Sequence, residues 1–421
     1  MNNIIVVGAG AAGLMAAGQA CSDFSSVILL EKMKFPGKKL RITGKGRCNL
    51  TNVAPVKDFI EQFRSDGRFL FSSFHRFFNQ ELIEYFDSLG VPCKIERGGR
   101  VFPESDKAQD VVDALVKVIK KKKVQIIKNV KVETLLLNEN RISGVTAVLQ
   151  KSNKKNEKVS YPADAVILCT GGASYPATGS TGDGYKLAKD SGHTIIPIRP
   201  SLVPLIYKDS ALKKLNGLEL KNVKANVWID GNPVMSEFGD LTFIDGRVSG
   251  PIILKMSRFI VDGIDKKKKV CFSIDLKPAL SVEKLFLRID RECEKSDSGK
   301  ISQILRKLMP QKLIMTCSTC TGLNPDKPTS DLTSHKRNQL LTWLKDFRFE
   351  VDGYGSFEEA IITAGGVSTK QVNPRTMESQ LIKGLYFAGE ILDMDANTGG
   401  YNLQAAFSTG WLAGRSAGNM E

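Results

Sequence analysis

The sequence predicts an α/β fold in which a Rossmann-like nucleotide-binding domain is interrupted by an inserted β-barrel domain with a helical subdomain. At the N-terminus, the buried-strand pattern of residues 4–7 runs directly into a glycine motif, GAGAAG. Near the C-terminus, an apolar strand at 385–388 leads through acidic and glycine residues into a helix from about 402 to 413. The segment between them changes character: residues 195–275 carry short alternating apolar stretches, which are typical of an antiparallel sheet or barrel.

We expect the nucleotide-binding domain at 1–195 and 354–421, and the inserted domain at 196–353 with its helical part at about 281–347. In the first part, the patterns predict Phe-rich helices over 57–90 and the following further elements: helices at 108–120 and 183–190, and strands at 125–128, 130–137, 144–150, 157–161 and 165–169. In the inserted domain they predict strands at 202–206, 223–229, 241–244 and 270–274, and helices at 282–294, 301–308 and 334–344. Residues 359–367 are expected to form a strand and a glycine turn.

The N-terminal glycine motif has the context that a dinucleotide-binding turn requires. It lies between a strand and a helix, and a second strand ends in Glu31, 23 positions after Gly8. Gly8 permits a tight turn, Gly10 lets the backbone approach a pyrophosphate, and Gly13 lets the helix pack on the strand. We expect Glu31 to accept hydrogen bonds from an adenosine ribose. The predicted contacts in this region are Gly8, Ala9, Gly10, Ala11, Ala12, Gly13, Glu31 and Lys32.

The C-terminal stretch 384–410 is expected to complete the site. Glu390 and Asp393 follow the predicted strand, and carboxylates can accept hydrogen bonds from sugar-like hydroxyls. The helix that follows offers free amides and a partial positive charge at its N-terminus. The contacts predicted here are Gly389, Glu390, Asp393, Gly399, Gly400, Tyr401 and Asn402.

The loop at 39–52 combines glycines, cations and amides with little apolar periodicity. Such a loop can approach a phosphate or a ring system closely, although a basic surface loop would have the same composition. Cys48 is predicted to pack, and a redox role is the alternative that the sequence leaves open. Together with the strand end at 170–172, this region contributes the remaining predicted contacts: Lys39, Gly44, Arg47, Cys48, Asn49, Val130, Thr170, Gly171 and Gly172.

Composition limits the class of protein. The chain has 421 residues, 42% hydrophobic and 25% charged, as in an ordinary globular protein. There is no apolar run of about 18 residues and the chain enters a strand at once, so we expect a cytoplasmic protein without a membrane partner. The eight cysteines are scattered; Cys317 and Cys320 form a single CxxC, and a zinc site would need a second pair, so we expect no metal.

The net charge is +15, with a pI of about 9.3. The lysine runs at 120–123 and 266–269 have no interleaved aromatic residues, and we expect them to be solvated faces: the end of a helix and a turn between strands. A nucleic-acid partner is therefore not expected from these runs. A basic surface can still attract an anionic cofactor or substrate.

Several motifs together resemble those of the bacterial flavoproteins named aminoacetone oxidase family FAD-binding enzymes, or NAD(P)/FAD-dependent oxidoreductases. They are VVGAGAAGLMAA, KKLRITGKGRCNLTN, GGRVFPES, LCTGGASYPATGSTGDGYKLAKDSGH, TAGGVSTKQVNPRTMES and LYFAGEILDMDANTGGYNLQAAFSTGWLAG. The resemblance covers almost the whole chain and implies a glutathione-reductase-like FAD domain interrupted by a β-barrel and a helical piece. Family members have been linked to oxidation of small amino-ketones and to reduction of steroid enones.

The chain departs from this family at two positions. Asp245 stands where relatives carry a histidine, so a substrate chemistry that uses this histidine would not transfer. Thr43 replaces the usual serine before the first glycine of the GRC loop, which is a mild change.

FAD fits better than NAD as the resident cofactor, because the C-terminal strand, Glu390 and the following helix have no role in a simple NAD domain. The helix start would stabilise the reduced flavin, and a flavin carries out hydride chemistry. We therefore expect noncovalent FAD and a small-molecule oxidoreductase, with amine or amino-ketone oxidation placed first. The alternatives are an NAD(P)H-dependent reductase of an enone and a flavin-binding redox sensor or RNA-associated protein; NAD(P)H would be a transient donor. Arg47, Cys48, Asn49 and Tyr401 are the candidate catalytic residues. The sequence does not indicate the substrate or the oligomeric state.

Overall fold

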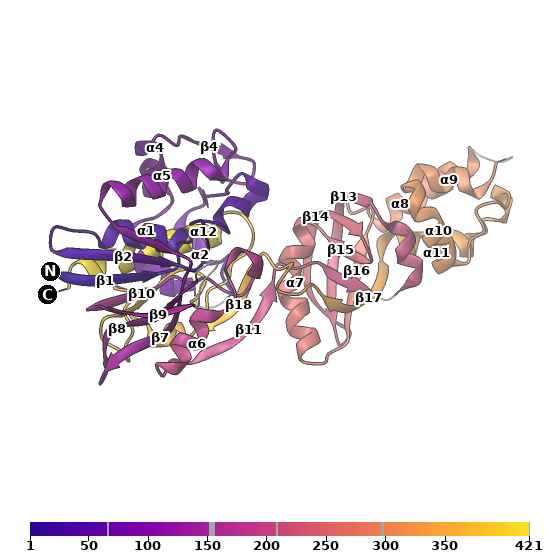
Figure 1. Cartoon of the computed structure of the whole chain (residues 1–421). Helices are drawn as coiled ribbons and strands as arrows, with labels where there is room; N and C mark the ends of the chain where they lie inside the picture. Colours follow the sequence, from indigo (N-terminus) through magenta and orange to yellow (C-terminus); the bar gives the residue numbers. More distant parts are fainter. Residues whose placement is uncertain (65–66, 151–155, 208, 296–298, 421) are drawn as a thin grey trace. The chain divides into compact units, whose positions relative to one another are not determined.

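A computed structural model describes residues 1–64, 67–150, 156–207, 209–295 and 299–420. The chain forms two compact units, one made of Met1–Pro200 with Ala360–Glu421 and the other of Ser201–Glu359 (Figure 1). Within the described part, no helix combines the length and the hydropathy that a transmembrane segment requires.

The first unit is built on a five-stranded parallel sheet, as the glycine motif predicts. Its strand order is β19-β10-β1-β2-β6. The strands are β1 (Asn2–Val7), β2 (Ser25–Glu31), β6 (Gln125–Lys128), β10 (Ala165–Leu168) and β19 (Leu385–Phe387). The residues of β1 pair in parallel register with both β2 and β10, from Ile4 opposite Val27 and Ala165 onward. Because the strands run in parallel, the glycine turn after β1, Glu31 and the segment after β19 all come to the same edge of the sheet.

Helices and smaller sheets surround this core. The helices are α1 (Ala11–Ala20), α2 (Val56–Ile60), α3 (Phe71–Arg76), α4 (Asn79–Ser88), α5 (Ala108–Lys121), α6 (Asp183–Asp190) and α12 (Tyr401–Gly418), with 3₁₀ turns η1 (Leu40–Gly46), η2 (Gly67–Leu70), η3 (Pro176–Thr178) and η6 (Thr369–Gln371). The smaller sheets are formed by β3 (Thr51–Asn52), β5 (Arg100–Pro103) and β4 (Cys93–Glu96); by β7 (Val130–Asn138), β8 (Arg141–Leu149) and β9 (Glu157–Pro162); and by β11 (Ile195–Ser201) and β18 (Ile362–Val367).

One prediction in this unit is wrong. Gly365 and Gly366 lie inside β18 and do not form a turn. Their φ angles are +84° and +135°, and a Cβ on Gly365 would overlap the carbonyl oxygen of Pro197 in β11. A side chain at Gly365 is excluded by β11, and one at Gly366 by the backbone of residues 391–393. Sequence pattern alone does not distinguish such close backbone approach from a turn.

The second unit contains a closed six-stranded barrel and a helical region. The barrel order is β12-β15-β14-β13-β16-β17. Its strands are β12 (Leu205–Tyr207), β13 (Leu218–Ile229), β14 (Asn232–Ile244), β15 (Arg247–Ser249), β16 (Val270–Asp275) and β17 (Phe347–Tyr354). The helices are α7 (Pro251–Asp265), α8 (Val282–Glu294), α9 (Ile301–Leu308), α10 (Gln311–Thr321) and α11 (Ser334–Lys345), with η4 (Ser210–Leu215) and η5 (Thr329–Asp331). Fold class and inserted barrel are thus as predicted.

Helix α7 is one of the elements that the sequence analysis did not predict; strands β11 and β17 are others. Gly250 and Pro251 open it, and its buried residues Ile252, Met256 and Ile260 recur at helical spacing. The lysine run 266–269 therefore follows a helix, and its description as a turn between strands is wrong.

Two helices from opposite ends of the sequence pack together at the centre of the first unit. Helices α1 and α12 lie side by side, and the chain termini are close, with the Asn2 side-chain amide donating to the Met420 carbonyl at 2.8 Å (Figure 1). Cβ atoms on Gly410 and Gly414 of α12 would overlap the carbonyl oxygens of Ala12 and Ala16. The contact therefore depends on the absence of side chains along one stripe of α12.

Substituting Gly410 with alanine tests this contact. Alanine favours a helix interior over glycine by about 1 kcal/mol, but the overlap with Ala12 must be relieved by moving backbone. We expect Gly410→Ala to lower the unfolding temperature by about 2–6 °C in thermal circular dichroism, since overpacking costs about 1–3 kcal/mol. Ser416→Ala, elsewhere on the same helix, is the control and should shift it by less than about 2 °C. An unchanged or raised unfolding temperature for Gly410→Ala would contradict the close packing.

Candidate nucleotide-binding site

The turn after β1 is too tightly packed for side chains at two of its three glycines. Gly8 has a φ of +98°, and a Cβ there would lie 2.6 Å from the carbonyl oxygen of Cys169 at the end of β10. A Cβ on Gly13 would overlap the carbonyl oxygen of Gly8 itself. These glycines allow α1 to begin directly against the sheet.

Gly10 differs from both, because open space surrounds it. Apart from Gly10 itself and its two chain neighbours, no heavy atom of the described residues lies within 4 Å of the position that its Cβ would take. It is the N-cap of α1, and no side chain caps this helix end. The first N–H groups of a helix have no partners within the helix and carry a partial positive charge. The cradle at Gly10 thus fits a pyrophosphate group.

Glu31 ends β2 beside this cradle. Its Oε2 accepts a hydrogen bond from the Ala9 N–H and its Oε1 one from the Met33 N–H, both at 2.7 Å. Burial raises the pKa of the carboxyl, and the backbone hydrogen bonds partly offset this rise. The carboxylate is held in place and retains acceptor capacity. Its contact with a ribose remains a prediction.

A second polar group lies at the carboxyl edge of the sheet, and we call Lys39, Ser174, Thr363 and Glu390 the Glu390 cluster. The Lys39 ammonium contacts Glu390 Oε2 at 2.7 Å and the Ser174 hydroxyl at 2.6 Å. Glu390 Oε1 accepts from the Ser174 hydroxyl at 3.0 Å and from the Thr363 N–H at 2.9 Å. Four separate chain segments thus meet at one carboxylate.

Ser174 and Thr363 were absent from the predicted site. The Thr363 hydroxyl accepts from the N–H groups of Ala173 and Ser174 at 2.8 and 3.1 Å, which fixes the loop after β10. A Cβ on Gly172 would overlap this hydroxyl, so Gly172 is required for the approach. Ser174 and Thr363 lie in the quoted motifs, within GGAS and TAGG respectively. These motifs were the sequence signal that could have placed both residues in the site.

The other predicted residues after β10 and β2 lie nearby in the first unit. Gly171 has a φ of +71°, and the buried Thr170 hydroxyl has no hydrogen-bond partner. Lys32 pairs with Asp183 of α6 at 2.6 Å, and Val130 is a buried residue at the start of β7. This hydroxyl packs against Gly184 of α6, where a Cβ would overlap it, so it is enclosed by the protein itself.

The loop and helix start that follow β19 are tied to the 39–52 loop. Gly389 has a φ of +77°, and its N–H donates to Thr409 of α12 at 3.0 Å. Gly400, with a φ of +98°, is the N-cap of α12, and no side chain caps it. With its amide oriented to suit its neighbours, Asn49 accepts from the Gly400 N–H at 3.0 Å. This brings Asn49 to the start of α12, as the combined site required.

The remaining C-terminal candidates have mostly structural partners. Asn402 accepts from the Ala396 N–H at 2.9 Å and so holds the loop before α12. The Tyr401 ring packs edge-on against Phe59 at 4.6 Å, and Gly399 lies under that ring. Burial raises the pKa of Asp393, and the neighbouring Asp395 adds to the rise.

Arg47 lies between carboxylates. Its guanidinium pairs with Glu96 and with Asp106, the latter at 2.6 Å, and it stands 4.2 Å over the Phe102 ring. Asp106 also pairs with Lys94 at 2.6 Å. Arg47 is thus fixed by partners of its own loop region, and any contact with a cofactor remains a prediction.

Cys48 is fully buried, and burial raises the pKa of its thiol to about 12. A nucleophilic or redox cysteine requires a thiolate, so this environment favours the packing interpretation. Gly44 has a φ of +57°, and a Cβ there would lie 3.0 Å from the Asn49 nitrogen, which explains the glycine in the GRC loop.

Asp245 has a local explanation in the second unit. With Gly246 it forms the turn between β14 and β15, at φ angles of +48° and +75°. Asp-Gly is a preferred pair for tight hairpins of this kind. Its carboxylate accepts from the Asn216 amide at 3.3 Å.

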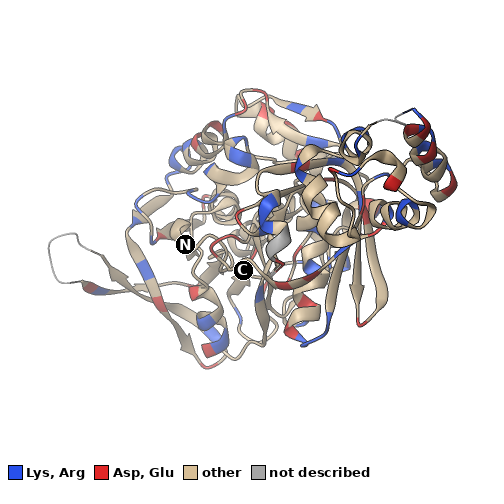
Figure 2. Cartoon of the chain, turned by 90° about the vertical axis from the view of Figure 1, so that its right-hand side faces the viewer, with Lys and Arg blue, Asp and Glu red and all other residues tan. Residues whose placement is uncertain are grey.

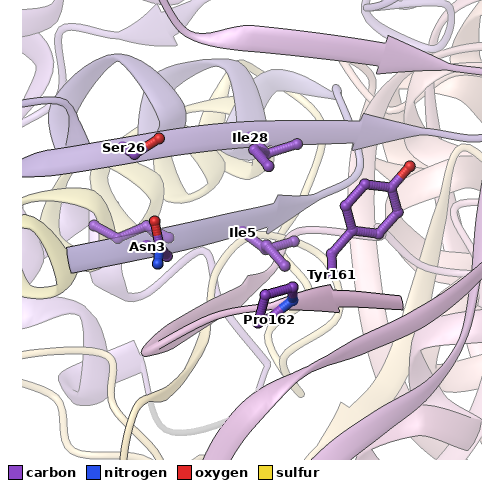
Figure 3. A pocket seen from close by; sticks show the side chains of 7 residues that line it. Asn3, Ile5, Ser26, Ile28, Tyr161 and Pro162 are labelled. Atoms are coloured by element: carbon purple, nitrogen blue, oxygen red, sulfur yellow. The ribbon is translucent and has the colours of Figure 1, made fainter. Parts of the chain in front are cut away.

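A pocket elsewhere in the first unit does not belong to this site. It is lined by residues of β1, β2 and β9, among them Asn3, Ser26 and Tyr161 (Figure 3). Most of its lining is apolar, no charged side chain lines it, and it lies away from the carboxyl ends of the strands where parallel sheets bind ligands. Among the described residues, no group of three or more His, Cys, Asp or Glu is arranged to hold a metal ion.

Comparison with known proteins decides the family. The family described as HI0933-like protein Rossmann domain matches residues 2–416. The chain belongs to this family. The 3-dehydro-bile acid delta(4,6)-reductase of Clostridium scindens is 33% identical over 419 residues, which is 99% of each chain. The ribosomal RNA dihydrouridine synthase of Escherichia coli is 30% identical over 410 residues, 97% of this chain and 96% of the relative.

Solved structures show the same fold at low sequence identity. A 3-ketosteroid-delta4-(5alpha)-dehydrogenase from Rhodococcus jostii has a TM-score of 0.50 at 16% identity, with 100% of this chain and 97% of that chain covered. A 3-ketosteroid delta1-dehydrogenase from Sterolibacterium denitrificans has a TM-score of 0.51 at 13% identity, with 99% and 100% covered. The family match and the full-length relatives together show that the chain is an FAD-dependent oxidoreductase of this family.

Gly10 and Glu31 provide a test of the cradle. We expect Gly10→Val to fold normally, because the site is open, but to lose bound FAD, since the branched side chain fills the space for the pyrophosphate. Glu31→Ala should weaken FAD binding by about 1.5–3 kcal/mol for each charge-assisted hydrogen bond lost. The measurement is the flavin-to-protein absorbance ratio after gel filtration, with circular dichroism to verify folding. Full FAD occupancy in both folded variants would refute this placement.

Cysteine reactivity tests the environment of Cys48. At pH 8 only about one thiol in ten thousand is ionised when its pKa is about 12. We expect native protein treated with N-ethylmaleimide to be modified first at the exposed Cys320 and not at Cys48 or the buried Cys169. Peptide mass mapping measures this, and urea-unfolded protein is the control in which all should react. Rapid modification of Cys48 in the native state would restore the redox hypothesis.

Proposed function

We propose that the chain reduces a carbon–carbon double bond conjugated with a carbonyl group, using a hydride from reduced FAD. The observation that carries this proposal is the pair of full-length relatives. A delta(4,6)-reductase of a 3-dehydro bile acid acts on ring double bonds next to a 3-keto group, and dihydrouridine is uridine reduced at a double bond conjugated with a ring carbonyl. The two names describe different molecules but the same reacting group.

Each group of residues in the site would have a separate role in this reaction. FAD, when bound, supplies the hydride chemistry. The Gly10 cradle and Glu31 would hold its adenosine diphosphate part, and the Glu390 cluster would offer a fixed carboxylate and ammonium to its ribityl hydroxyls. The partial positive charge at the start of α12 would favour negative charge on a ring held there. Tyr401, at that start, is a candidate proton donor to the substrate; Arg47, Cys48 and Asn49 orient the loop.

The sequence analysis placed oxidation of an amine or amino-ketone first. Here it is the alternative reaction for the same flavin. It has no support among the relatives described above, whose names are those of reductive or reduction-product chemistry. NAD(P)H remains the proposed transient donor. No second GxGxxG is present in the sequence, so the donor would dock only for electron transfer and leave.

Uracil in RNA is a second candidate substrate beside a steroid-like enone. The sequence analysis did not expect a nucleic-acid partner, and the ribosomal RNA dihydrouridine synthase similarity reopens this question. The net charge of +15 favours a polyanion over a bile acid, while the higher identity to the bile-acid reductase favours the enone.

Anaerobic flavin titration distinguishes these reactions. We expect NADH or NADPH to bleach the oxidised flavin near 450 nm, and a 4-en-3-one steroid or a uracil-containing RNA to restore the colour. An amine oxidase would behave in the opposite way, with aminoacetone alone bleaching the flavin and oxygen restoring it. Failure of both enone and RNA to reoxidise reduced enzyme would overturn the proposed reduction.

The Glu390 cluster gives the matched variants for this experiment. Glu390→Gln keeps the size of the side chain but removes the charge that pairs with Lys39, and should lower both FAD occupancy and the rate of flavin reoxidation by tenfold or more. Glu359→Gln in the second unit, which breaks a half-exposed pair with Arg247, is the control and should leave both unchanged.

A further inference from the structure

The loop from Lys32 to Arg47 has two faces with different charge environments. On its inner face, every cation has a carboxylate partner: Lys32 contacts Asp183, Lys39 contacts Glu390, and Arg47 contacts Glu96 and Asp106. These ion pairs join the loop to other segments of the first unit, so the basic residues on that face contribute to the fold.

The outer face carries four further cations: Lys34, Lys38 and Lys45 are exposed, and Arg41 is partly buried, with its Nε enclosed. In the part of the chain that the structure describes, none of the four forms an ion pair with a carboxylate. Lys38 donates instead to the Ala177 carbonyl at 2.6 Å. A concentration of unpaired positive charge is unfavourable for the isolated protein and is relieved when an anion binds. Figure 2 shows basic and acidic residues together on several helices, while the lysine runs 120–123 and 266–269 are further clusters of basic residues.

Apolar side chains are interleaved with these cations. Phe35 is 50% exposed and Ile42 is 46% exposed. The Lys34 ammonium lies 5.4 Å and the Arg41 guanidinium 5.8 Å from the centre of the Phe35 ring. We call Lys34, Phe35, Lys38, Arg41, Ile42 and Lys45 the outer loop patch. An exposed aromatic ring among unpaired cations is the arrangement that single-stranded nucleic acid binds, with phosphates on the cations and a base on the ring.

The patch is anchored directly beside the nucleotide site. The Gly37 N–H donates to the Ala9 carbonyl of the glycine motif at 2.7 Å, and Gly37 packs on Val112 of α5 with a φ of +68°. Lys39, two residues further on, reaches Glu390 at the carboxyl end of β19. A chain held on the outer face would therefore lie next to the edge of the sheet where the cofactor binds.

We propose that the outer loop patch is a docking surface for single-stranded RNA. The proposal concerns RNA binding. It rests on the proposed function only where the bound RNA would also be the substrate that is reduced. An anionic membrane would be attracted by the same charge, but it would favour an amphipathic helix with a broad apolar face. The patch offers a 3₁₀ turn and a loop with two separate apolar side chains, which suits a narrow, flexible polyanion.

The test is binding of a fluorescent single-stranded oligouridylate to the oxidised holoenzyme, followed by anisotropy at several salt concentrations. Wild type should bind with an affinity that falls as salt rises. Lys34→Glu/Lys45→Glu should weaken binding about tenfold or more and reduce the salt slope by about 1.4, since each phosphate contact on a single strand contributes about 0.7. Phe35→Ala should weaken binding with little change in slope, because stacking involves no counterion release.

Lys266→Glu/Lys267→Glu is the matched control, with the same change in net charge on exposed lysines of the second unit. It should weaken binding less than threefold. Equal losses in both double variants, or no oligouridylate binding at about 50 mM salt, would overturn the proposal. Retention on phosphatidylglycerol vesicles without RNA binding would assign the patch to a membrane and also overturn it.

Flavin content and turnover are measured separately in each variant. If the outer loop variants lose RNA binding but still reduce a free enone, the docking surface and the reaction are both supported and independent. If RNA binds at the patch but no conjugated double bond is reduced, the docking proposal stands and the proposed function fails.

Discussion

The close approach of α12 to α1 is the contact on which the candidate site depends. The two helices come from opposite ends of the sequence, and Gly410, Gly414 and Gly418 let α12 lie directly on the backbone of α1. This approach also sets Gly389 against Ala12, so the segment after β19 arrives next to the first glycine turn. Together with the parallel pairing of β1 with β10 and of β10 with β19, it brings the Gly10 cradle and Glu390 to the same edge of the sheet. Glycine is less favourable than alanine inside a helix, but at these three positions a Cβ would overlap the backbone of α1.

Two carboxylates show how this edge of the sheet is kept rigid. Glu31 is buried and would lose much solvation, but two backbone N–H groups hold it. Glu390 takes a lysine, a serine hydroxyl and a backbone N–H from three other segments. In each case the donors come from the segments that the carboxylate has to join. A ligand with hydroxyl groups therefore meets acceptors already oriented, and little side-chain entropy has to be lost on binding.

Basic residues of the 32–47 loop have two different roles, according to whether they pair with carboxylates. Lys32, Lys39 and Arg47 pair with carboxylates and contribute to the fold, whereas the cations of the outer loop patch have no such partners among the described residues. Net charge alone could not separate these roles, because it counts both faces together. The same reasoning applies to Arg47, whose pairing with Glu96 and Asp106 makes it a support of the loop in this structure.

The sequence by itself determined the fold class and the parts of the site that are local in the chain. A strand, a glycine turn and a helix adjoin within residues 2–20, and Glu31 follows at a fixed distance, so periodicity and spacing were sufficient. Helix α7 was missed because a short apolar run suits a strand as well as a helix, and the Gly365–Gly366 pair was misassigned because a close strand and a turn require the same residue. Only the tertiary structure decided which side chains meet at Glu390, that Cys48 is buried, that Asp245 serves a hairpin turn and which basic residues of the 32–47 loop pair with carboxylates. Those facts depend on contacts between segments up to several hundred residues apart, and local pattern carries no information about the partner's position.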